Sequence, residues 1–418
     1  MAEPDKKTML QTDMQLAPGW LLYLYGEKSF ICESGNQYNR AELNEIEYDV
    51  VDAINRLHLM SDVWAFIKEE YSIEDGNEEA EEVFWSYVEN LIDSKMINEG
   101  SKTRRVYGER GKCFPLYVSI ELTDRCNFKC RHCYKEAESS NSTFIDADKL
   151  IDFINYLGKN PYSLELTGGE ATLHPDFSRI VRSFPDKTFS LLTNGSMLAR
   201  LPEDVLKKLL HLQITVYGCT EEEYRTEACC PAFSDVCAGI KRVNELGVPN
   251  TVTIIVRSSN AKTIGGYFEV LSGLGVKEIR FGLTTNTGRN LEGAWSLTRD
   301  ECEQFFLGLD EYRKKYPDML IHDLKWQVDY DKPPFPVKDT YTIACDAGTQ
   351  SITISEAGYV RPCNMMPADC FGDHTIDDYK AHIDSGKSLP FDCAIARCVK
   401  KYKAMGKTVD CICPRGFA

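Results

Sequence analysis

Three cysteines crowd into the segment ELTDRCNFKCRHCY, residues 121–134. Cys126, Cys130 and Cys133 follow the spacing C-x3-C-x2-C. Thiolates spaced in this way hold iron–sulfur clusters or zinc. A cubane [4Fe-4S] cluster has four irons, and protein thiolates usually hold all four, so three cysteines leave one iron free for a ligand from outside the protein. The spacing therefore predicts a cluster with one open coordination position.

A zinc site is the alternative, with His132 as the fourth ligand beside the same three cysteines. Zinc sites usually combine one C-x2-C pair with a second, distant pair. His132 instead lies inside the loop. The spacing therefore favours the iron–sulfur cluster over zinc.

A second group of cysteines lies toward the C-terminus. The chain has 17 cysteines, and its last region contains Cys345, Cys363, Cys370, Cys393, Cys398, Cys411 and Cys413. In a reducing compartment, clustered cysteines more often bind metal or take part in chemistry than form disulfides. We therefore expect a small domain at residues 341–418 that metal holds together in place of a large core. The scattered cysteines elsewhere are expected to be ordinary core or surface residues.

Length and charge limit the classes of function. A chain of 418 residues is too long for one ordinary core, so we expect two or three domains. With 48 basic and 64 acidic residues the net charge is -16, which argues against a broad nucleic-acid interface. No apolar run reaches the roughly 18 residues that a membrane span needs. The first residues also lack the apolar core of a secretory signal, and we expect a cytosolic protein.

The first region, residues 1–102, predicts a small α+β module. The runs WLLYLY and KSFICE have the composition of short strands. Three apolar stripes at helical spacing follow, of which the last is Val83, Phe84, Tyr87 and Val88. The basic stretch KTRRVYGERGK, residues 102–112, is predicted to be a linker.

The middle region, residues 103–310, alternates β-rich runs with helical patterns. The expected strands are LYVSIEL, SLELT, TFSLLT, QITVYG, TVTIIV and EIRFG. Six β/α units predict an α/β fold, a parallel sheet that curls into a partial (β/α)6 TIM-like barrel. In such barrels the chemistry lies at the carboxyl ends of the strands, and the three cysteines follow the first strand directly. Residues 311–340, with the proline-rich DKPPFPVKD, are predicted to be a linker.

The order of these motifs resembles the radical S-adenosylmethionine (radical SAM) enzymes. Their signature is C-x3-C-x2-C followed by an aromatic residue, here Tyr134, just after the first strand. LTGGEATLHPDF, residues 166–177, is similar to the family's GGEP-type stretch, with Ala171 where proline is usual. LLTNGS and ITVYG fall where the family has its motifs after the third strand and at the fourth.

The resemblance implies a binding site for S-adenosylmethionine. Gly168 and Gly169 would let the backbone approach the methionine amino group, and Glu170 would accept a hydrogen bond from that ammonium. Thr215 would offer its hydroxyl to the ribose or the carboxylate. The implied cofactor-binding residues are Tyr134, Gly168, Gly169, Glu170, Thr193, Asn194 and Thr215.

The resemblance also implies a reaction. The amino and carboxylate groups of S-adenosylmethionine would chelate the open iron. One electron would then split S-adenosylmethionine into methionine and a 5′-deoxyadenosyl radical. That radical abstracts hydrogen from an unactivated carbon, while the protein supplies orientation and excludes water. A flavodoxin or ferredoxin type of donor would supply the electron. The sequence identifies no residue as a catalytic acid or base.

The C-terminal cysteines resemble a SPASM domain, which carries auxiliary iron–sulfur clusters. Cys345, Gly358 and Cys363 match the start of its pattern, whereas the continuation departs from it. By order along the chain, one auxiliary cluster would take Cys345, Cys363 and Cys411, and the other would take Cys370, Cys393, Cys398 and Cys413. Two complete cubanes need eight thiolates, whereas this region has seven cysteines. One iron would therefore stay open for a substrate thiolate. A single cluster with spare cysteines, or zinc, are the alternatives.

Residues 1–102 resemble the PqqD-type peptide-recognition element that is fused to maturases of ribosomally made peptides. Such modules bind a leader peptide by adding it as a strand to their sheet, and an acidic surface suits a leader that contains lysine. A generic winged-helix or dimerisation module is the alternative.

Together these resemblances imply a peptide maturase that makes Cys-to-carbon thioether cross-links, as in sactipeptide or ranthipeptide synthesis. Carbon–carbon cross-linking and epimerisation are the next candidates. A sulfatase-maturase-like enzyme is less favoured, since those relatives carry an Asp where this chain has Asn364. A cluster-bearing binding or electron-transfer protein without radical chemistry is the alternative of a different class.

Overall fold

The computed structural model describes residues 6–34, 36–100, 104–186, 188–284, 288–290, 296–322, 348–364, 374–387 and 404. The chain divides into two units. The first comprises Met1–Leu116, Leu157–Tyr162 and Ala381–Ser388, and the second comprises Tyr117–Tyr156, Ser163–Lys380 and Leu389–Ala418. Across these described ranges, no helix combines the length and the apolar character that crossing a membrane requires.

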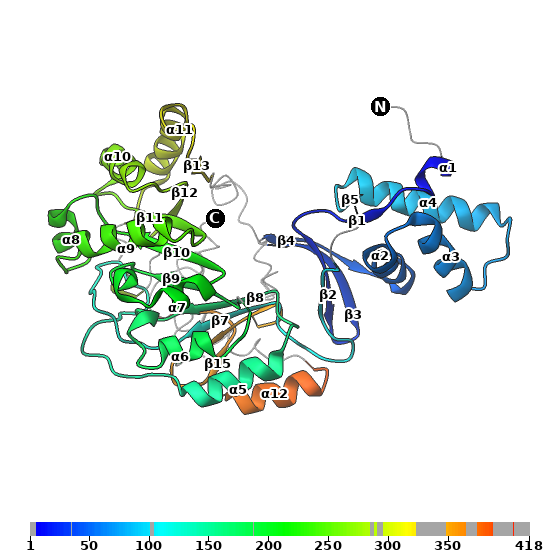
Figure 1. Cartoon of the computed structure of the whole chain (residues 1–418), viewed down its shortest axis with the longest axis horizontal. Helices are drawn as coiled ribbons and strands as arrows, with labels where there is room; N and C mark the ends of the chain where they lie inside the picture. The colour runs from blue at the N-terminus through cyan, green and yellow to red at the C-terminus, as the bar shows by residue number, and fades with distance from the viewer. Residues whose placement is uncertain are drawn as a thin grey trace. The chain divides into compact units, whose positions relative to one another are not determined.

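The first unit contains a small sheet and a group of helices (Figure 1). Its elements are α1 Lys6–Met9, β1 Met14–Leu16, β2 Trp20–Tyr25, β3 Lys28–Glu33, β4 Asn36–Leu43, α2 Glu45–Leu57, α3 Met60–Glu70, α4 Glu78–Asp93, β5 Ile97–Glu99 and β6 Val106–Gly108. The sheet order is β4-β3-β2-β6, and β1 pairs separately with β5. The two predicted strands and three predicted helices are confirmed. The stretch 102–112 is not only a linker, because it contributes β6, which pairs with β2.

Local sequence signals explain these helices. α2 begins at a capping box, in which Glu47 N donates to Asn44 Oδ1 at 2.9 Å and Asn44 N donates to Glu47 Oε2 at 2.8 Å. Most residues of the three apolar stripes are buried in one core, with Val51, Val63 and Val88 inaccessible to solvent, whereas Val83 is exposed. In Figure 1, α2, α3 and α4 lie on one side of the β2–β3 sheet.

The second unit is built on a nine-stranded sheet of order β13-β12-β11-β10-β9-β8-β7-β14-β15. Its strands are β7 Tyr117–Glu121, β8 Ser163–Thr167, β9 Phe189–Thr193, β10 His211–Val216, β11 Asn250–Val256, β12 Glu278–Leu283, β13 Leu320–Ile321, β14 Ser351–Ile354 and β15 Val360–Arg361. The helices from β7 onward are α5 Ala147–Leu157, α6 Phe177–Arg182, α7 Glu203–Lys208, α8 Glu221–Glu227, α9 Phe233–Glu245, α10 Gly265–Gly273, α11 Arg299–Lys315 and α12 Ile376–Asp384. Short 3-10 helices are η1 Ala171–Leu173, η2 Leu198–Arg200, η3 Ala261–Thr263 and η4 Gly288–Asn290.

The six predicted barrel strands, β7 to β12, are confirmed in order and direction. Each pairs in parallel with the next one along the chain. Their carboxyl ends therefore lie on one edge of the sheet, where loops can combine residues from several strands. Figure 1 shows the sheet with the helices between successive strands.

Three further strands extend this sheet beyond the prediction. β13 pairs in parallel with β12, and β14 pairs in parallel with β7 and antiparallel with β15. An unpaired edge strand tends to be covered in native proteins, and here later segments of the chain cover both edges of the predicted sheet. Residues 351–361 of the cysteine-rich region thus share the sheet that bears the three-cysteine loop.

Alternation along the strands gives the sheet two different faces. On β8, Leu164 and Leu166 are buried, whereas Ser163 and Glu165 on the opposite face are partly exposed. On β10, Leu212 and Ile214 are likewise buried. The apolar face is therefore part of the core that stabilises the sheet.

We expect Leu166→Ala to destabilise the second unit by about 3 kcal/mol, the usual cost of removing a buried leucine side chain and leaving a cavity. Leu166 is inaccessible to solvent, whereas Leu210 is 48% exposed. Leu210→Ala is the control and should leave the free energy of unfolding nearly unchanged. Urea unfolding followed by circular dichroism measures both, and equal effects would contradict this packing.

Candidate active site

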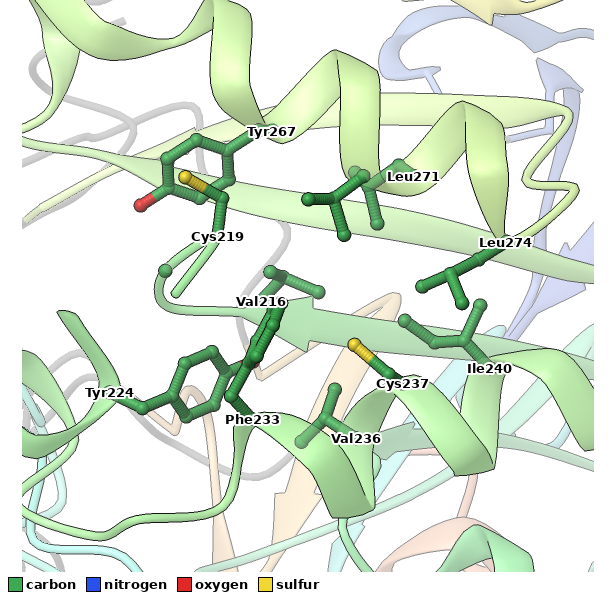
Figure 2. A pocket seen from close by; sticks show the side chains of 12 residues that line it. Val216, Cys219, Tyr224, Phe233, Val236, Cys237, Ile240, Tyr267, Leu271 and Leu274 are labelled. Carbon is green, nitrogen blue, oxygen red and sulfur yellow. The ribbon is translucent and has the colours of Figure 1, made fainter. Parts of the chain in front are cut away.

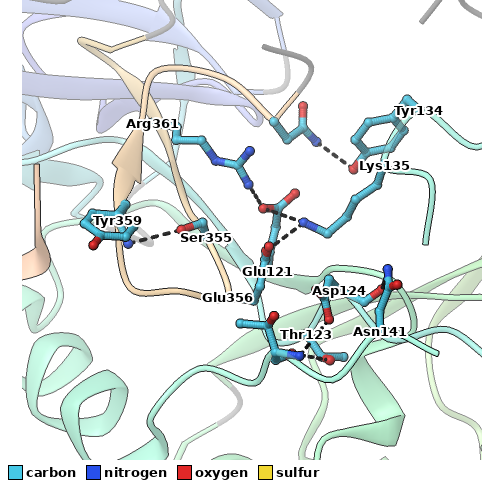
Figure 3. Close-up of polar contacts among 12 residues, drawn as sticks. Glu121, Thr123, Asp124, Tyr134, Lys135, Asn141, Ser355, Glu356, Tyr359 and Arg361 are labelled. Atoms are coloured by element: carbon cyan, nitrogen blue, oxygen red, sulfur yellow. Dashed lines mark hydrogen bonds and ion pairs between the residues drawn. The ribbon is translucent and has the colours of Figure 1, made fainter. Parts of the chain in front are cut away.

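The loop after β7 carries the three predicted cluster ligands. Cys126 and Cys130 are buried, and Cys133 is partly exposed. The start of the loop is anchored by Thr123, whose hydroxyl donates to Thr143 O at 2.7 Å. Asp124 Oδ1 accepts from Thr143 N at 2.9 Å (Figure 3). The cysteines therefore lie at the carboxyl end of the first parallel strand, as predicted.

The thiols are held in a buried, polar environment. Phe128 N and Asn194 Nδ2 donate to Cys126 Sγ at 3.3 and 3.8 Å. Burial raises the pKa of Cys126 to about 12, and the carboxylate of Glu170 acts in the same direction. Burial also raises the pKa of Cys130, with smaller contributions from Cys133 and Cys126. The three thiols thus lie within electrostatic range of one another, and a bound cation would be needed to stabilise their thiolates.

The glycine turn after β8 packs directly on this loop. Gly169 N donates to Thr123 O at 2.7 Å, and Glu170 N donates to Arg125 O at 2.8 Å. A Cβ atom on Gly168 would lie 2.4 Å from Thr123 O, and one on Gly169 would lie 2.3 Å from Arg125 O. The two glycines thus allow a close backbone approach, here to residues 123–125. Their approach to a methionine amino group stays a prediction.

Glu170 joins the loops that follow β8 and β9. Its Oε1 accepts from Thr172 N at 3.2 Å, Thr172 Oγ1 at 2.5 Å and Thr193 Oγ1 at 2.8 Å. Its Oε2 accepts from Asn194 N at 2.7 Å. Burial raises the pKa of Glu170, and these hydrogen bonds oppose that shift. Of the residues expected to bind S-adenosylmethionine, Gly168, Gly169, Glu170, Thr193 and Asn194 are therefore brought together beside Cys126.

Thr215 and Tyr134 complete the predicted set. Thr215 lies on β10 one position after Ile214, which pairs with Thr193 of β9. The hydroxyl of Tyr134 accepts from Asn364 Nδ2 at 3.5 Å (Figure 3). Burial raises the pKa of Tyr134, and the thiols of Cys133 and Cys363 act in the same direction. The segment that carries Cys363 therefore lies beside the three-cysteine loop, whereas Cys345, Cys370, Cys393, Cys398, Cys411 and Cys413 lie outside the described residues.

Arg289 braces the cysteine loop and was not predicted from the sequence. Its Nε donates to Cys130 O and its Nη2 donates to Ala137 O, both at 2.8 Å. The adjacent Gly288 has a positive φ, and a Cβ there would lie 2.4 Å from the carbonyl oxygen of Cys133. The only available signal was the turn sequence TGRN after the sixth strand.

A buried ion pair braces the same loop from another side. Arg257, at the end of β11, contacts Glu227 Oε2 through its Nε at 3.2 Å and donates to Tyr217 O at 2.8 Å. The backbone carbonyl of Glu227 accepts from Arg131 N at 3.1 Å. Arg257 is 1% exposed, so this pair is part of the protein interior. Neither residue was predicted to belong to the site.

The donor set fits a [4Fe-4S] cluster better than zinc. In the described ranges, no group of three or more His, Cys, Asp or Glu side chains is arranged to hold a metal ion. The ligands of a zinc ion surround one centre, whereas each thiolate of a cubane holds a different iron. The arrangement therefore gives no support to a zinc site that includes His132.

Two further thiols line a small apolar cavity between α9, α10 and the end of β10 (Figure 2). Cys219 and Cys237 contribute to its wall together with Val216 and Leu271. Its volume is about 10 Å³, which is about the space that one water molecule needs. Burial raises the pKa of both thiols. This cavity is too small for S-adenosylmethionine and is not the candidate active site.

The middle of the chain is similar to a known protein family. Residues 120–257 match the family model of the Radical SAM superfamily. This range contains the three-cysteine loop, the glycine turn after β8 and the strands β8 to β11.

Two proteins of Bacillus subtilis (strain 168) are similar to most of the chain. The antilisterial bacteriocin subtilosin biosynthesis protein AlbA is 24% identical over 328 residues, 75% of this chain and 70% of that protein. The sporulation killing factor maturation protein SkfB is 26% identical over 364 residues, 84% of this chain and 82% of that protein.

The crystal structure of Streptococcus suis SuiB has the same fold. Its TM-score is 0.63 at 13% identity, and the match covers 96% of this chain and 99% of that chain. A structure of SuiB bound to its precursor peptide SuiA matches with a TM-score of 0.54 over 84% of this chain and 83% of that chain. The parallel sheet of the second unit is thus shared with this solved protein.

We expect Glu170→Gln to weaken binding of S-adenosylmethionine. Each carboxylate oxygen accepts from a backbone N–H, that of Thr172 or of Asn194. Either orientation of a glutamine amide therefore turns an NH2 group toward an N–H donor, and each lost hydrogen bond to a charged group costs about 1.5–3 kcal/mol. Equilibrium dialysis with labelled S-adenosylmethionine measures the affinity.

The matched control is Glu165→Gln. Glu165 is also on β8, and among the described residues its carboxylate accepts from Ser119 Oγ at 3.4 Å. Its substitution should change the affinity much less. Equal affinities for the wild type and Glu170→Gln would show that the junction of the two loops does not support the cofactor.

Proposed function

This chain is an enzyme of the radical SAM superfamily, and we propose that it joins a cysteine sulfur to a carbon through a thioether bond in a ribosomally synthesised precursor peptide. AlbA and SkfB are named for bacteriocin biosynthesis and for maturation of a killing factor. SuiB has been solved with a precursor peptide bound. These likenesses support a peptide as the substrate.

The residues at the carboxyl edge of the sheet would bind the cofactors. Cys126, Cys130 and Cys133 would hold the [4Fe-4S] cluster, and the residues gathered around Glu170 would orient S-adenosylmethionine beside it. When bound, the pair supplies a 5′-deoxyadenosyl radical that takes a hydrogen atom from a peptide carbon. The protein contributes burial, since Cys126 is 8% and Cys130 is 7% exposed, which keeps water from two of the thiolates that would hold the cluster.

The observation that carries the thioether proposal is the contact between Tyr134 and Asn364. Tyr134 follows Cys133 in the first loop, and Asn364 follows Cys363 in the cysteine-rich region. Joining C–H to S–H removes two hydrogen atoms. The radical takes one of them, and the other leaves as a proton and an electron, so a one-electron acceptor must lie nearby. An auxiliary cluster with Cys363 among its ligands, in a SPASM-like domain, would be that acceptor.

Asn364 also bears on the alternative of a sulfatase-maturase-like enzyme. An amide has no basic group, and its NH2 donates to the hydroxyl of Tyr134. The position therefore supports a structural contact between the two segments and offers no carboxylate to act as a base. This favours peptide cross-linking over that alternative.

The first unit would bind the leader of the peptide as a PqqD-like recognition element. β4 lies at one edge of its sheet, where a peptide strand could be added. An acidic groove of about 600 Å³ lies between α2 and α4 and is lined by Glu47, Glu79, Glu82, Val83, Ser86, Tyr87 and Asn90. Val83 is 66% exposed, so the groove combines an apolar contact with carboxylates. It suits a leader segment that carries lysine or arginine beside an apolar side chain.

Removing the first cluster should abolish radical formation. The variant Cys126→Ala/Cys130→Ala/Cys133→Ala is purified without oxygen and its iron is counted. On four irons per cubane, about twelve irons in the wild type should fall to about eight. The reduced wild type should convert S-adenosylmethionine to 5′-deoxyadenosine, and the variant should not.

A control variant removes three other thiols, Cys219→Ala/Cys230→Ala/Cys237→Ala, and should keep both the iron content and this activity. The proposed function is wrong if the wild type holds zinc alone and leaves S-adenosylmethionine intact under strong reductant. If the wild type holds four irons and still forms 5′-deoxyadenosine, the proposed radical step is supported and the proposed auxiliary clusters are wrong.

Neutralising the acidic groove should weaken leader binding. Glu79→Gln/Glu82→Gln removes two charges from the groove, and each exposed charge contributes about 0.2–1 kcal/mol. Fluorescence anisotropy measures the affinity for a labelled synthetic peptide that carries lysine residues beside an apolar side chain. The difference from wild type should shrink as salt is added, because exposed charges are screened.

Glu69→Gln/Glu70→Gln is the matched control, since it removes two exposed charges from α3 outside the groove. It should bind like the wild type. Equal weakening by both double variants would show that net charge alone, and not the groove, attracts the peptide.

A further inference from the structure

Four charged side chains of the second unit meet beside the cysteine loop (Figure 3). Glu121, the last residue of β7, contacts Lys135 Nζ through its Oε2 at 3.0 Å and pairs through the same oxygen with the guanidinium of Arg361. Lys135 Nζ also contacts Glu356 Oε2 at 2.7 Å. The two carboxylates and two cations balance in charge. We call these four residues the charge cluster.

The charge cluster is largely buried. The side chain of Glu121 is 0% exposed, and those of Lys135 and Arg361 are 9% and 10% exposed. Taking charges out of water is costly, and apolar replacements of a buried ion pair are often as stable or more stable. Stability alone is therefore a weak reason for this arrangement. A buried ion pair can instead fix the position of one segment relative to another.

The segments that the charge cluster joins each carry a thiol. Lys135 lies two residues after Cys133, and Arg361 lies two residues before Cys363. Glu356 lies in the turn between β14 and β15. These segments are far apart in sequence, since Lys135 and Glu356 are separated by 221 positions along the chain.

Two other contacts run between the same segments. β14 pairs with β7 up to the partners Ile354 and Ile120. The amide of Asn364 donates to the hydroxyl of Tyr134. The ladder, the charge cluster and this hydrogen bond follow one another from the sheet outward to the thiols, and the charge cluster is the link between the ladder and the thiols.

We propose that Glu121, Lys135, Glu356 and Arg361 are positioning residues that fix the separation between the loop of Cys133 and the segment of Cys363. This inference rests on the proposed function, in which the two cysteines belong to different clusters. Cross-linking then needs a constant separation, because the carbon radical forms near one cluster and the electron leaves toward the other. A misplacement of about 1 Å in such a site can lower a rate about 10²-fold.

Lys135→Met and Glu356→Gln are the informative variants. Lys135→Met leaves Glu121 paired with Arg361, and Glu356 is exposed enough, at 18%, to be solvated. Glu356→Gln leaves Lys135 paired with Glu121. Lys135→Arg keeps the charge and serves as the conservative variant. Arg182→Met, which breaks the exposed pair with Asp204, is the matched control.

Pulsed electron paramagnetic resonance is recorded on the full-length, reconstituted and reduced protein without any peptide. It measures the distance between the cluster held by the loop of Cys133 and the auxiliary cluster held by Cys363. Wild type, Lys135→Arg and Arg182→Met should share one narrow distribution of distances. Lys135→Met and Glu356→Gln should broaden or shift it by about 1 Å or more, the scale at which rates respond. Iron content and formation of 5′-deoxyadenosine with dithionite should stay at the wild-type level in all of them.

Unchanged distance distributions in both informative variants, at full iron content, would overturn the inference while leaving the proposed function intact. If Lys135→Met loses iron, Glu356→Gln alone decides, since it keeps both cations and the buried pair. A wild type that shows no second cluster contradicts the proposed function, and the inference fails with it.

Discussion

The site depends on one close backbone approach, between the loop after β7 and the glycine turn after β8. Two hydrogen bonds join Gly169 N and Glu170 N to the carbonyls of Thr123 and Arg125. A side chain on Gly168 or Gly169 would collide with those carbonyls, so the contact exists only because both residues lack a Cβ. It brings the loop with the first thiol against the turn that presents Glu170. The remaining polar contacts of the site are built on that junction.

Burial around this junction demands that every polar group has a partner, because an unpaired buried donor or acceptor is costly. Glu170 meets that demand for two loops at once, through Thr172 and Asn194. Asn194 then donates to Asn127 Oδ1 at 2.9 Å and to the sulfur of Cys126 at 3.8 Å. Cys126 is thus connected by hydrogen bonds to the ends of β8 and β9.

The three-cysteine loop has little regular structure of its own, so its backbone carbonyls and amides must be satisfied from outside. Long cationic side chains and the loops near them meet this need. Arg289 reaches the carbonyl of Cys130, the Arg257–Glu227 pair supports the backbone of Arg131, and Lys135 is anchored to Glu121.

The sequence alone determined the features that depend on short-range pattern. Alternating apolar residues predicted β7 to β12 in order, and parallel pairing followed because helical patterns separate them. The spacing of Cys126, Cys130 and Cys133 predicted an iron–sulfur cluster, since one loop holds all three. The glycine turn could be recognised for the same reason. In each case the residues that act together are neighbours along the chain.

Only the tertiary structure decided the contacts between distant segments. Arg289 is 159 positions from Cys130, and Lys135 is 221 positions from Glu356, so no local spacing links them. β13 and β15 have two residues each, too few to give a periodic signal, and they are strands because the edges beside them accept hydrogen bonds. β6 lies in a basic stretch typical of a linker and is a strand because β2 offers it a partner. Folding, not local pattern, places the segment of Cys363 beside the three-cysteine loop.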